Sequence, residues 1–149
     1  MSSYVSDTNK GLLDAMCDGL ILIAEDDRDL LETLKMRCER IGCSVLAVDD
    51  ALSALSCADF AMPSLIILDV QMPGGNGLAV CEMLASNPNF SAIPVIVHSG
   101  KADHETVERC HKLNAHHVAK SPHSWSILEP LIRKLLTNRP VEALSEHSD

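Results

Sequence analysis

Aromatic residues are scarce in this chain of 149 residues, in which one Trp, one Tyr and two Phe make up 3% of the sequence. Hydrophobic residues as a whole still account for 46%, so a core has to be built mostly from Leu, Ile, Val, Ala and Met. The length suits one compact domain with short tails.

Positive charge is also in short supply, since 12 Lys and Arg stand against 21 Asp and Glu, for a formal net charge of −9. Nonspecific binding to nucleic acid or to an anionic membrane needs a positive surface, so we expect neither partner. No apolar run reaches the roughly 18 residues that span a bilayer. The first residues, MSSYVSDTNKG, lack the basic start and apolar core of a secretory signal, and we expect a cytoplasmic protein.

Paired spacings of metal-binding or redox residues are missing as well. No two cysteines form C-x-x-C, and several lie in apolar stretches, which favours buried free thiols in a reducing compartment over a zinc site or a redox motif. For the adjacent His116 and His117 we expect a structural or surface role, because structural metal sites need paired spacings. The cysteines are Cys17, Cys38, Cys43, Cys57, Cys81 and Cys110.

What the sequence does contain is a regular alternation of short apolar runs with segments of helical periodicity. This alternation predicts a parallel sheet covered by helices on both faces. The expected strands are 19–24, 44–48, 65–68, 95–97 and 117–119. The expected helices cover about 30–41, 51–58, 77–85 and 104–113, followed by a last helix that carries 128–136.

Capping residues mark several of these boundaries. Asp27, Asp50 and Asp103 stand where N-caps are expected, and Gly42 stands where the first helix should stop. Pro130 does not suit the interior of a helix that starts near Ser124, so we expect a late start or a kink there.

Polar side chains follow four of the five expected strands at the point where each strand ends. Glu25 and Asp26 follow the first strand, Asp69 the third, Ser99 the fourth and Lys120 the fifth. The carboxyl ends of parallel strands share one edge of the sheet, where function collects in such folds. We therefore expect these side chains to converge.

The chemistry of this set points to phosphoryl transfer. Three carboxylates in one pocket repel each other, and Mg²⁺ relieves that repulsion because it accepts a few oxygen ligands and keeps several waters. Asp69 can then attack phosphorus and form an acyl phosphate. Lys120 can offset the developing charge, the Ser99 hydroxyl can donate to a phosphoryl oxygen, and Gly100 leaves room beside it.

Each of these residues also has an ordinary interpretation when it is taken alone. Acids at 25–27 stabilise a helix N-terminus, Asp69 could be a turn acid, and Ser99 and Lys120 could be loop residues. Those interpretations do not predict that all of them share one edge, so the joint pattern favours the functional reading.

Four segments carry a family resemblance: LILIAEDD, LIILDVQMPGGNG, IPVIVHSG and HHVAK, in that order. With them the chain resembles the receiver domain of two-component response regulators over about residues 19–138. The resemblance implies an α/β fold, a single flavodoxin-like (βα)5 domain whose five-stranded parallel sheet has the order 2-1-3-4-5 and helices on both faces. Residues 1–18 would be an N-terminal extension and 139–149 a flexible C-terminal tail.

The resemblance also implies roles for individual residues. Phosphorylation in the family pulls a hydroxyl inward and an aromatic residue follows, and His117 stands where that aromatic residue is common. By motif, Glu25 and Asp26 match the acidic pair that binds Mg²⁺, and Gln71 matches the position whose backbone carbonyl binds the metal. Asp69 matches the phosphoacceptor, which is also a metal ligand. Ser99 matches the switch hydroxyl, and Lys120 matches the lysine of the site.

The implied partners are a sensor histidine kinase or phosphotransfer protein and a downstream protein target. The chain would be no enzyme beyond catalysing its own phosphorylation and dephosphorylation. Only a short segment follows the last helix, so we expect a single-domain regulator whose output is a protein contact. The usual family interface for such a contact, or for a homodimer, is helix four, strand five and helix five.

Two positions depart from the family pattern. Proline usually follows the lysine directly, often with a cis bond, whereas this chain has Ser121 and then Pro122. A cis bond before a non-proline residue costs about 2.5–4 kcal/mol, so we expect a trans bond between Lys120 and Ser121 or a locally altered loop. His98 stands before Ser99, where an apolar residue is common.

Three other functions compete with this interpretation. A pseudo-receiver would bind partners without being phosphorylated. A phosphohydrolase with an aspartyl nucleophile would need a second acid two residues on, where this chain has Gln71. A flavodoxin-like electron carrier would need a phosphate-binding loop after the first strand, where acids would repel the flavin phosphate.

Overall fold

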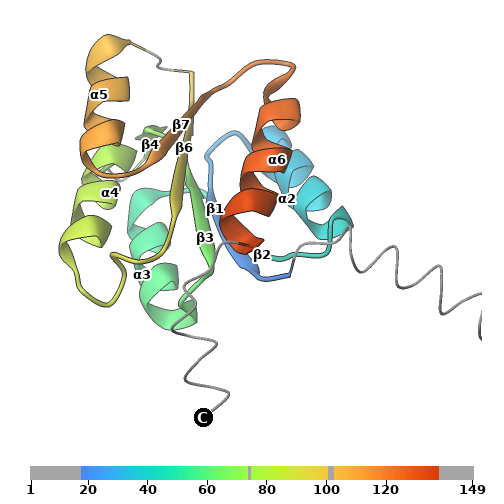
Figure 1. Ribbon diagram of the computed structural model, residues 1–149, viewed down its shortest axis with the longest axis horizontal. Helices are drawn as coiled ribbons and strands as arrows, with labels where there is room; N and C mark the ends of the chain where they lie inside the picture. The colour runs from blue at the N-terminus through green and yellow to red at the C-terminus, as the bar shows by residue number, and fades with distance from the viewer. Residues whose placement is uncertain (1–17, 74, 101–102, 138–149) are drawn as a thin grey trace, which may run out of the picture.

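The computed structural model describes residues 18–73, 75–100 and 103–137, and the rest of the chain is drawn as a grey trace in Figure 1. Its centre is a five-stranded parallel sheet in the order β2-β1-β3-β6-β7. In chain order of these strands this is 2-1-3-4-5, so the expected topology is confirmed. The strands are β1 (Leu20–Ala24), β2 (Ser44–Val48), β3 (Leu65–Leu68), β6 (Val95–Ser99) and β7 (His116–Ala119).

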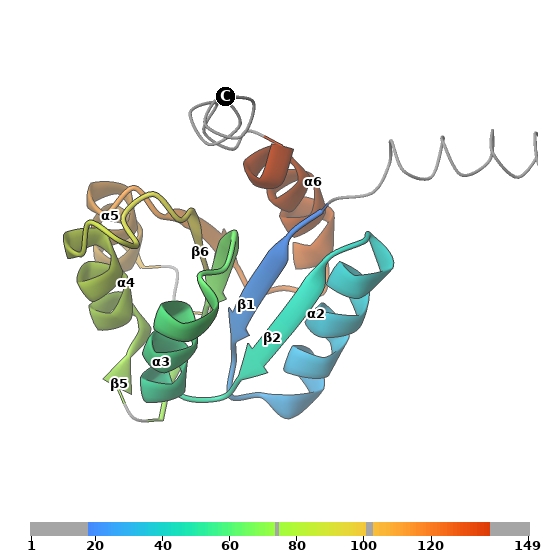
Figure 2. The same ribbon diagram turned by 90° about the horizontal axis from the view of Figure 1, so that it is seen from below.

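Helices cover both faces of the sheet, as Figures 1 and 2 show. One face carries α2 (Arg28–Arg40) and α6 (Ser124–Thr137). The other carries α3 (Ala51–Ala61), α4 (Gly77–Ser86) and α5 (His104–Lys112). Among the described residues, none of the helices combines the length and the apolar composition that a membrane-spanning helix needs.

The central strand β3 consists of a continuous apolar run, and its position in the sheet explains why. All four of its residues are buried, because a parallel strand with helices on both faces meets apolar side chains on each side. Leu65 and Ile67 pack into the core under α2 and α6, whereas Ile66 and Leu68 pack into the core under α3, α4 and α5. Side chains therefore alternate between two cores along each strand.

Most of the expected helix starts are confirmed. The Asp27 carboxylate accepts a hydrogen bond from Leu30 N at 3.2 Å, and the Asp50 carboxylate accepts one from Ser53 N at 2.7 Å. Gly42 lies one position beyond the place we assigned to it. The C-cap of α2 is Ile41, and Gly42 follows with a φ of 104°, which suits a glycine in the turn that ends the helix.

We expected a late start or a kink in the last helix, and the late start is wrong. The helix α6 begins at Ser124 and continues through Pro130 to Thr137. Proline removes the hydrogen bond to the carbonyl four residues earlier, and that carbonyl belongs to the exposed Ser126, where water can satisfy it. Leu128, Ile132 and Leu136 are buried on one face of α6 and hold both halves of the helix on the sheet.

The segment after β3 forms a small feature that we did not expect. Strands β4 (Gln71–Met72) and β5 (Gly75–Asn76) pair in antiparallel fashion and lead directly into α4. The proposed extension at residues 1–18 and tail at 139–149 lie outside the described residues, except for Asp18.

Candidate functional site

The site begins where β1 and β3 end side by side. Leu68 pairs with Ala24, and the Asp69 backbone N donates to the Ala24 carbonyl oxygen at 3.0 Å. Glu25 N in turn donates to the Val48 carbonyl oxygen of β2 at 3.0 Å. The backbone of the sheet therefore positions both acids at the same edge.

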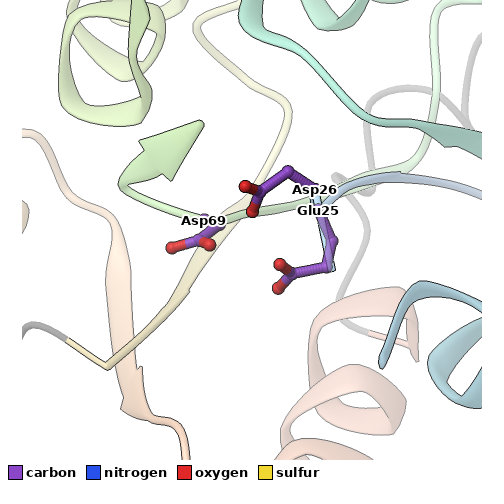
Figure 3. A group of neighbouring side chains, drawn as sticks. All are labelled: Glu25, Asp26 and Asp69. Carbon is purple, nitrogen blue, oxygen red and sulfur yellow. The ribbon is translucent and has the colours of Figure 1, made fainter. Parts of the chain in front are cut away.

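Three carboxylates converge at this edge. Glu25, Asp26 and Asp69 each offer an oxygen within 4.8 Å of the others, and Figure 3 shows their side chains facing a common space. Glu25 and Asp69 are only 2% and 4% exposed, whereas Asp26 is exposed. In the described part of the chain these side chains form the only such group of three potential metal ligands.

Lys120 follows β7, an edge strand of the sheet, and its side chain reaches this group from there. Its Nζ lies 2.8 Å from Asp69 Oδ2 and 2.9 Å from Glu25 Oε1. Burial works to lower the pKa of Lys120, but the hydrogen bonds to Asp69 and Glu25 outweigh it and the pKa is raised. Burial raises the pKa of Glu25 against the opposing effect of Lys120, and the nearby charge of Asp69 adds to the rise.

Backbone amides hold the remaining carboxylate oxygens of the two buried acids. Glu25 Oε2 accepts from Asp27 N at 3.1 Å, and Asp69 Oδ1 accepts from Gln71 N at 3.2 Å. These bonds fix each acid near its own strand end. Gln71 itself is exposed in β4, and the role of its carbonyl as a metal ligand stays a prediction.

Gly77 is a residue of the site that sequence reasoning missed. A Cβ atom on Gly77 would lie 2.0 Å from the Asp69 carbonyl oxygen and 2.9 Å from Val70 Cα. Its backbone N donates to the Val70 carbonyl oxygen at 2.9 Å. The only available signal was a glycine at the first position of a helix, where it lowers helix propensity.

Ser99 lies on β6, the strand next to β3, and His117 lies on β7, one strand further from Asp69. Ser99 is fully buried at the end of β6, and its carbonyl oxygen accepts from Lys120 N at 3.0 Å. His117 is half-buried in β7 beside Val97. The switch roles of both residues stay predictions. A Cβ atom on Gly100 would meet nothing within 4 Å, in agreement with the expected space beside Ser99.

The bond between Lys120 and Ser121 is trans, since the described residues contain no cis peptide bond. The expectation of a trans bond is confirmed.

The donor set fits a hard divalent cation. Three carboxylates face one ammonium group, so negative charge is in excess, and the exposed Asp26 leaves the group open to solvent. Oxygen ligands of this kind, with space for retained waters, are what Mg²⁺ prefers. No described histidine or cysteine joins the group, and those are the ligands that zinc would favour.

Comparison with known proteins places the chain among signalling proteins. The family model for the response regulator receiver domain matches residues 21–128. The transcriptional regulatory protein CseB of Streptomyces coelicolor is 31% identical over 116 residues, which cover 78% of this chain and 48% of CseB. Protein PilG of Pseudomonas aeruginosa is 28% identical over 90 residues, covering 60% of this chain and 67% of PilG. The chain thus spans about half the length of CseB.

Solved structures show the same architecture. The signal receiver domain of a histidine kinase from Syntrophus aciditrophicus has a TM-score of 0.73 at 32% identity, covering 80% of this chain and 90% of that one. The non-phosphorylated HemR receiver domain of Leptospira biflexa has a TM-score of 0.73 at 29% identity, covering 81% and 97%. TrrA of Thermotoga maritima, solved in complex with Mg²⁺-BeF, shares the fold with a TM-score of 0.71 at 23% identity, covering 78% and 98%.

Proposed function

The chain belongs to the response regulator receiver domain family, and we propose from this that it accepts a phosphoryl group on Asp69 in two-component signalling. The donor would be a histidine kinase or a phosphotransfer protein. The observation that carries the proposal is the convergence of Lys120 and three carboxylates, from three separate strands, on one edge of the sheet.

The proposed reaction is an in-line transfer to a carboxylate oxygen of Asp69. That oxygen forms a bond to phosphorus while the bond from phosphorus to the donor nitrogen breaks, and the electron pair of that bond stays with the donor imidazole. Lys120 is already within hydrogen-bonding distance of Asp69, so its ammonium group can follow the negative charge onto the phosphoryl oxygens. The Ser99 hydroxyl is the proposed donor to one of those oxygens.

Mg²⁺ is the proposed cofactor, and when bound it would offset the repulsion between the acids and the incoming phosphoryl group. Glu25, Asp26 and Asp69 would hold it through carboxylate oxygens, and Gln71 through its backbone carbonyl. The proposal is supported by the fit of this oxygen-rich donor set and by the excess negative charge that Lys120 does not balance.

We propose that the output is a protein contact on the face formed by α5, β7 and α6. A groove of about 650 Å³ lies on this face and is lined by residues that include His116, His117 and Leu131. Ile127, which also lines it, is 54% exposed and offers apolar area to a partner. The partner would be a downstream protein or a second copy of the chain, and the net charge of −9 argues against nucleic acid.

A cytoplasmic site of action is part of the same proposal. Cys57, Cys81 and Cys110 are free thiols. Free thiols suit a reducing compartment, which is where a cytoplasmic kinase domain would meet its receiver.

The decisive experiment is phosphorylation with a small phosphodonor in the presence of Mg²⁺, followed by intact mass measurement. We expect a mass gain of one phosphoryl group that is lost in Asp69→Ala and on chelation of Mg²⁺. Asp26→Asn should keep the acceptor but require more Mg²⁺. A wild-type protein that gains no mass and does not respond to beryllofluoride would instead support the pseudo-receiver, a partner-binding module without phosphorylation.

A further inference from the structure

His98 is a buried imidazole without a hydrogen-bonding partner. It lies in β6 directly before Ser99, and it is 1% exposed. Neither Nδ1 nor Nε2 has a partner among the residues that the structure describes. More than about nine in ten buried polar groups are hydrogen-bonded, so an unpaired ring beside a reactive site needs an explanation.

The strand register places His98 next to Asp69. Leu68 of β3 pairs with Val97 of β6, so the next residue along each strand brings Asp69 abreast of His98. Adjacent strands lie about 4.8 Å apart. Alternation also puts the two side chains on one face of the sheet, because Ile67 and Ile96, each two residues earlier, both belong to the core under α2 and α6.

Lys120 approaches the same point from the other side. Its strand β7 is the edge strand, and β6 separates it from β3. Val118 pairs with His98, so the Lys120 side chain starts two residues beyond that pair and has to cross β6 to contact Asp69. The imidazole of His98 is therefore on the strand that the Lys120 side chain crosses to reach Asp69.

The surroundings keep this imidazole neutral. The pKa of His98 is lowered to about 4, chiefly by burial. The charge of Lys120 contributes to this lowering, Asp69 opposes it to a smaller extent, and His117 adds a still smaller lowering effect. A neutral imidazole carries one N–H donor and one acceptor nitrogen. His98 can therefore offer a donor to Asp69 without adding a positive charge to a site that must accept a cation.

We propose that His98 is a positioning residue that donates its ring N–H to the Asp69 carboxyl group once Lys120 turns to the phosphoryl group, and that it thereby shortens the lifetime of the acyl phosphate. This inference rests on the proposed phosphorylation of Asp69. Before phosphorylation, the two Asp69 oxygens accept from Gln71 N and Lys120 Nζ. When Lys120 turns away, a carboxyl oxygen loses its donor, and the unpartnered imidazole of His98 can supply another.

The effect on lifetime follows from the charge that develops during hydrolysis. A water oxygen forms a bond to phosphorus, the bond from phosphorus to the Asp69 oxygen breaks, and its electron pair stays on the carboxylate, while the water gives up one proton to solvent. Hydrogen bonds to a charged acceptor are roughly twice as strong as those to a neutral one. The His98 N–H therefore stabilises the departing carboxylate more than the acyl phosphate, and it speeds dephosphorylation.

Two variants of His98 test this role. His98→Val removes the donor and leaves an apolar side chain in the strand, whereas His98→Gln keeps an N–H donor. We expect the phosphorylated protein to lose its phosphoryl group about three- to tenfold more slowly in His98→Val. The rate in His98→Gln should lie between those of His98→Val and the wild type. Equal lifetimes in the wild type and His98→Val, or equal lifetimes in the two variants, would overturn the inference.

A spectroscopic measurement on the wild-type protein avoids any effect of substitution on folding. With ¹⁵N-labelled histidine, we expect beryllofluoride to produce a hydrogen-bonded, slowly exchanging ring N–H from His98, and we expect no such signal in Asp69→Asn. Unchanged ring resonances in a protein that binds beryllofluoride would contradict the role. A wild-type protein that neither binds beryllofluoride nor gains a phosphoryl group would instead refute the proposed function itself.

Discussion

The backbone of Asp69 lies against Gly77 so closely that a Cβ atom on Gly77 would stand 2.0 Å from the Asp69 carbonyl oxygen. The carbonyl oxygen belongs to the backbone, and a Cβ atom is fixed by the backbone of its own residue, so neither can swing aside as the end of a flexible side chain would. Gly77 starts α4, and its N–H is bonded to the Val70 carbonyl. The first turn of α4 therefore sets how far the loop after Asp69 can move.

Gly77→Ala should destabilise the protein and disturb the acceptor. Alanine is the better helix former by about 1 kcal/mol, so a loss of stability can only come from the contact with Asp69. We expect a loss of about 1–3 kcal/mol in the free energy of unfolding, as for other overpacked sites, together with slower phosphorylation. Urea unfolding and the phosphodonor reaction measure the two effects.

Gly100→Ala is the matched control for stability, because a Cβ atom there meets nothing within 4 Å. It should stay within about 0.5 kcal/mol of the wild type. If both alanine variants unfold at the same urea concentration as the wild type, the close contact between Gly77 and Asp69 has no energetic consequence.

Because the pKa of Glu25 is raised, the stability of the metal-free protein should depend on the protonation of this residue. The folded state binds this proton more tightly than the unfolded chain, whose ordinary value is 4.5. Glu25 therefore opposes folding above its raised pKa, and this penalty disappears as the pH falls toward 4.5. Glu25→Gln should gain stability relative to the wild type near neutral pH, and the gain should shrink as the pH falls through that window.

Unfolding curves in EDTA at several pH values measure this difference. Glu32→Gln on the exposed side of α2 removes a charge of the same sign and serves as the control. A difference between Glu25→Gln and the wild type that does not change with pH would show that the Glu25 carboxyl group titrates alike in both states.

The buried thiols should be inert toward alkylating reagents in the folded protein. Burial raises the pKa of Cys81 to about 12, with a smaller effect from Cys110, and only a thiolate reacts at a useful rate. Cys57 is half-buried and should be modified first. Peptide mapping after brief treatment at pH 8 compares the two sites, and the unfolded protein should show no preference. Modification of Cys81 as fast as Cys57 in the folded protein would refute this.

Local patterns in the sequence were sufficient for the strands, most helix starts and the position of each polar residue at a strand end. An apolar run followed by an acid, as in Leu68 and Asp69, predicts both a buried strand and the edge at which it stops. Because parallel strands share that edge, convergence of Glu25, Asp69 and Lys120 could be inferred without knowing any distance. N-caps such as Asp50 depend on residues only three positions away, which is why they could be placed.

Contacts between distant backbones could not be inferred in this way. The approach of Gly77 to Asp69 depends on how the β4–β5 hairpin turns the chain into α4, and composition carries no sign of it. The position of His98 beside Asp69 depends on the register between β3 and β6, which the topology alone leaves open. The tolerance of α6 for Pro130 could not be inferred either, because the cost of this proline depends on whether the freed carbonyl of Ser126 is exposed, and this is a property of the folded helix.

Lys120 bridges Glu25 and Asp69, so loss of its charge should destabilise the protein. Lys120 is the cation that two buried carboxylates share, and its side chain is 25% exposed. Lys120→Met keeps most of the side-chain length and removes the charge, which leaves Glu25 and Asp69 to repel each other. Breaking a buried pair costs about 3–5 kcal/mol, and partial exposure puts this case at about 2–4 kcal/mol at neutral pH in EDTA.

Mg²⁺ should recover more of the stability in Lys120→Met than it adds to the wild type, because the metal then supplies the only cation for the acids. Lys134→Met in the last turn of α6 is the control for loss of one positive charge elsewhere, and Mg²⁺ should stabilise it by the same amount as the wild type. Chemical unfolding with and without Mg²⁺ gives these differences directly. An equal response to Mg²⁺ in all three proteins would mean that Lys120 and the metal do not compete for the same carboxylates, and the proposed metal site would then have to lie elsewhere.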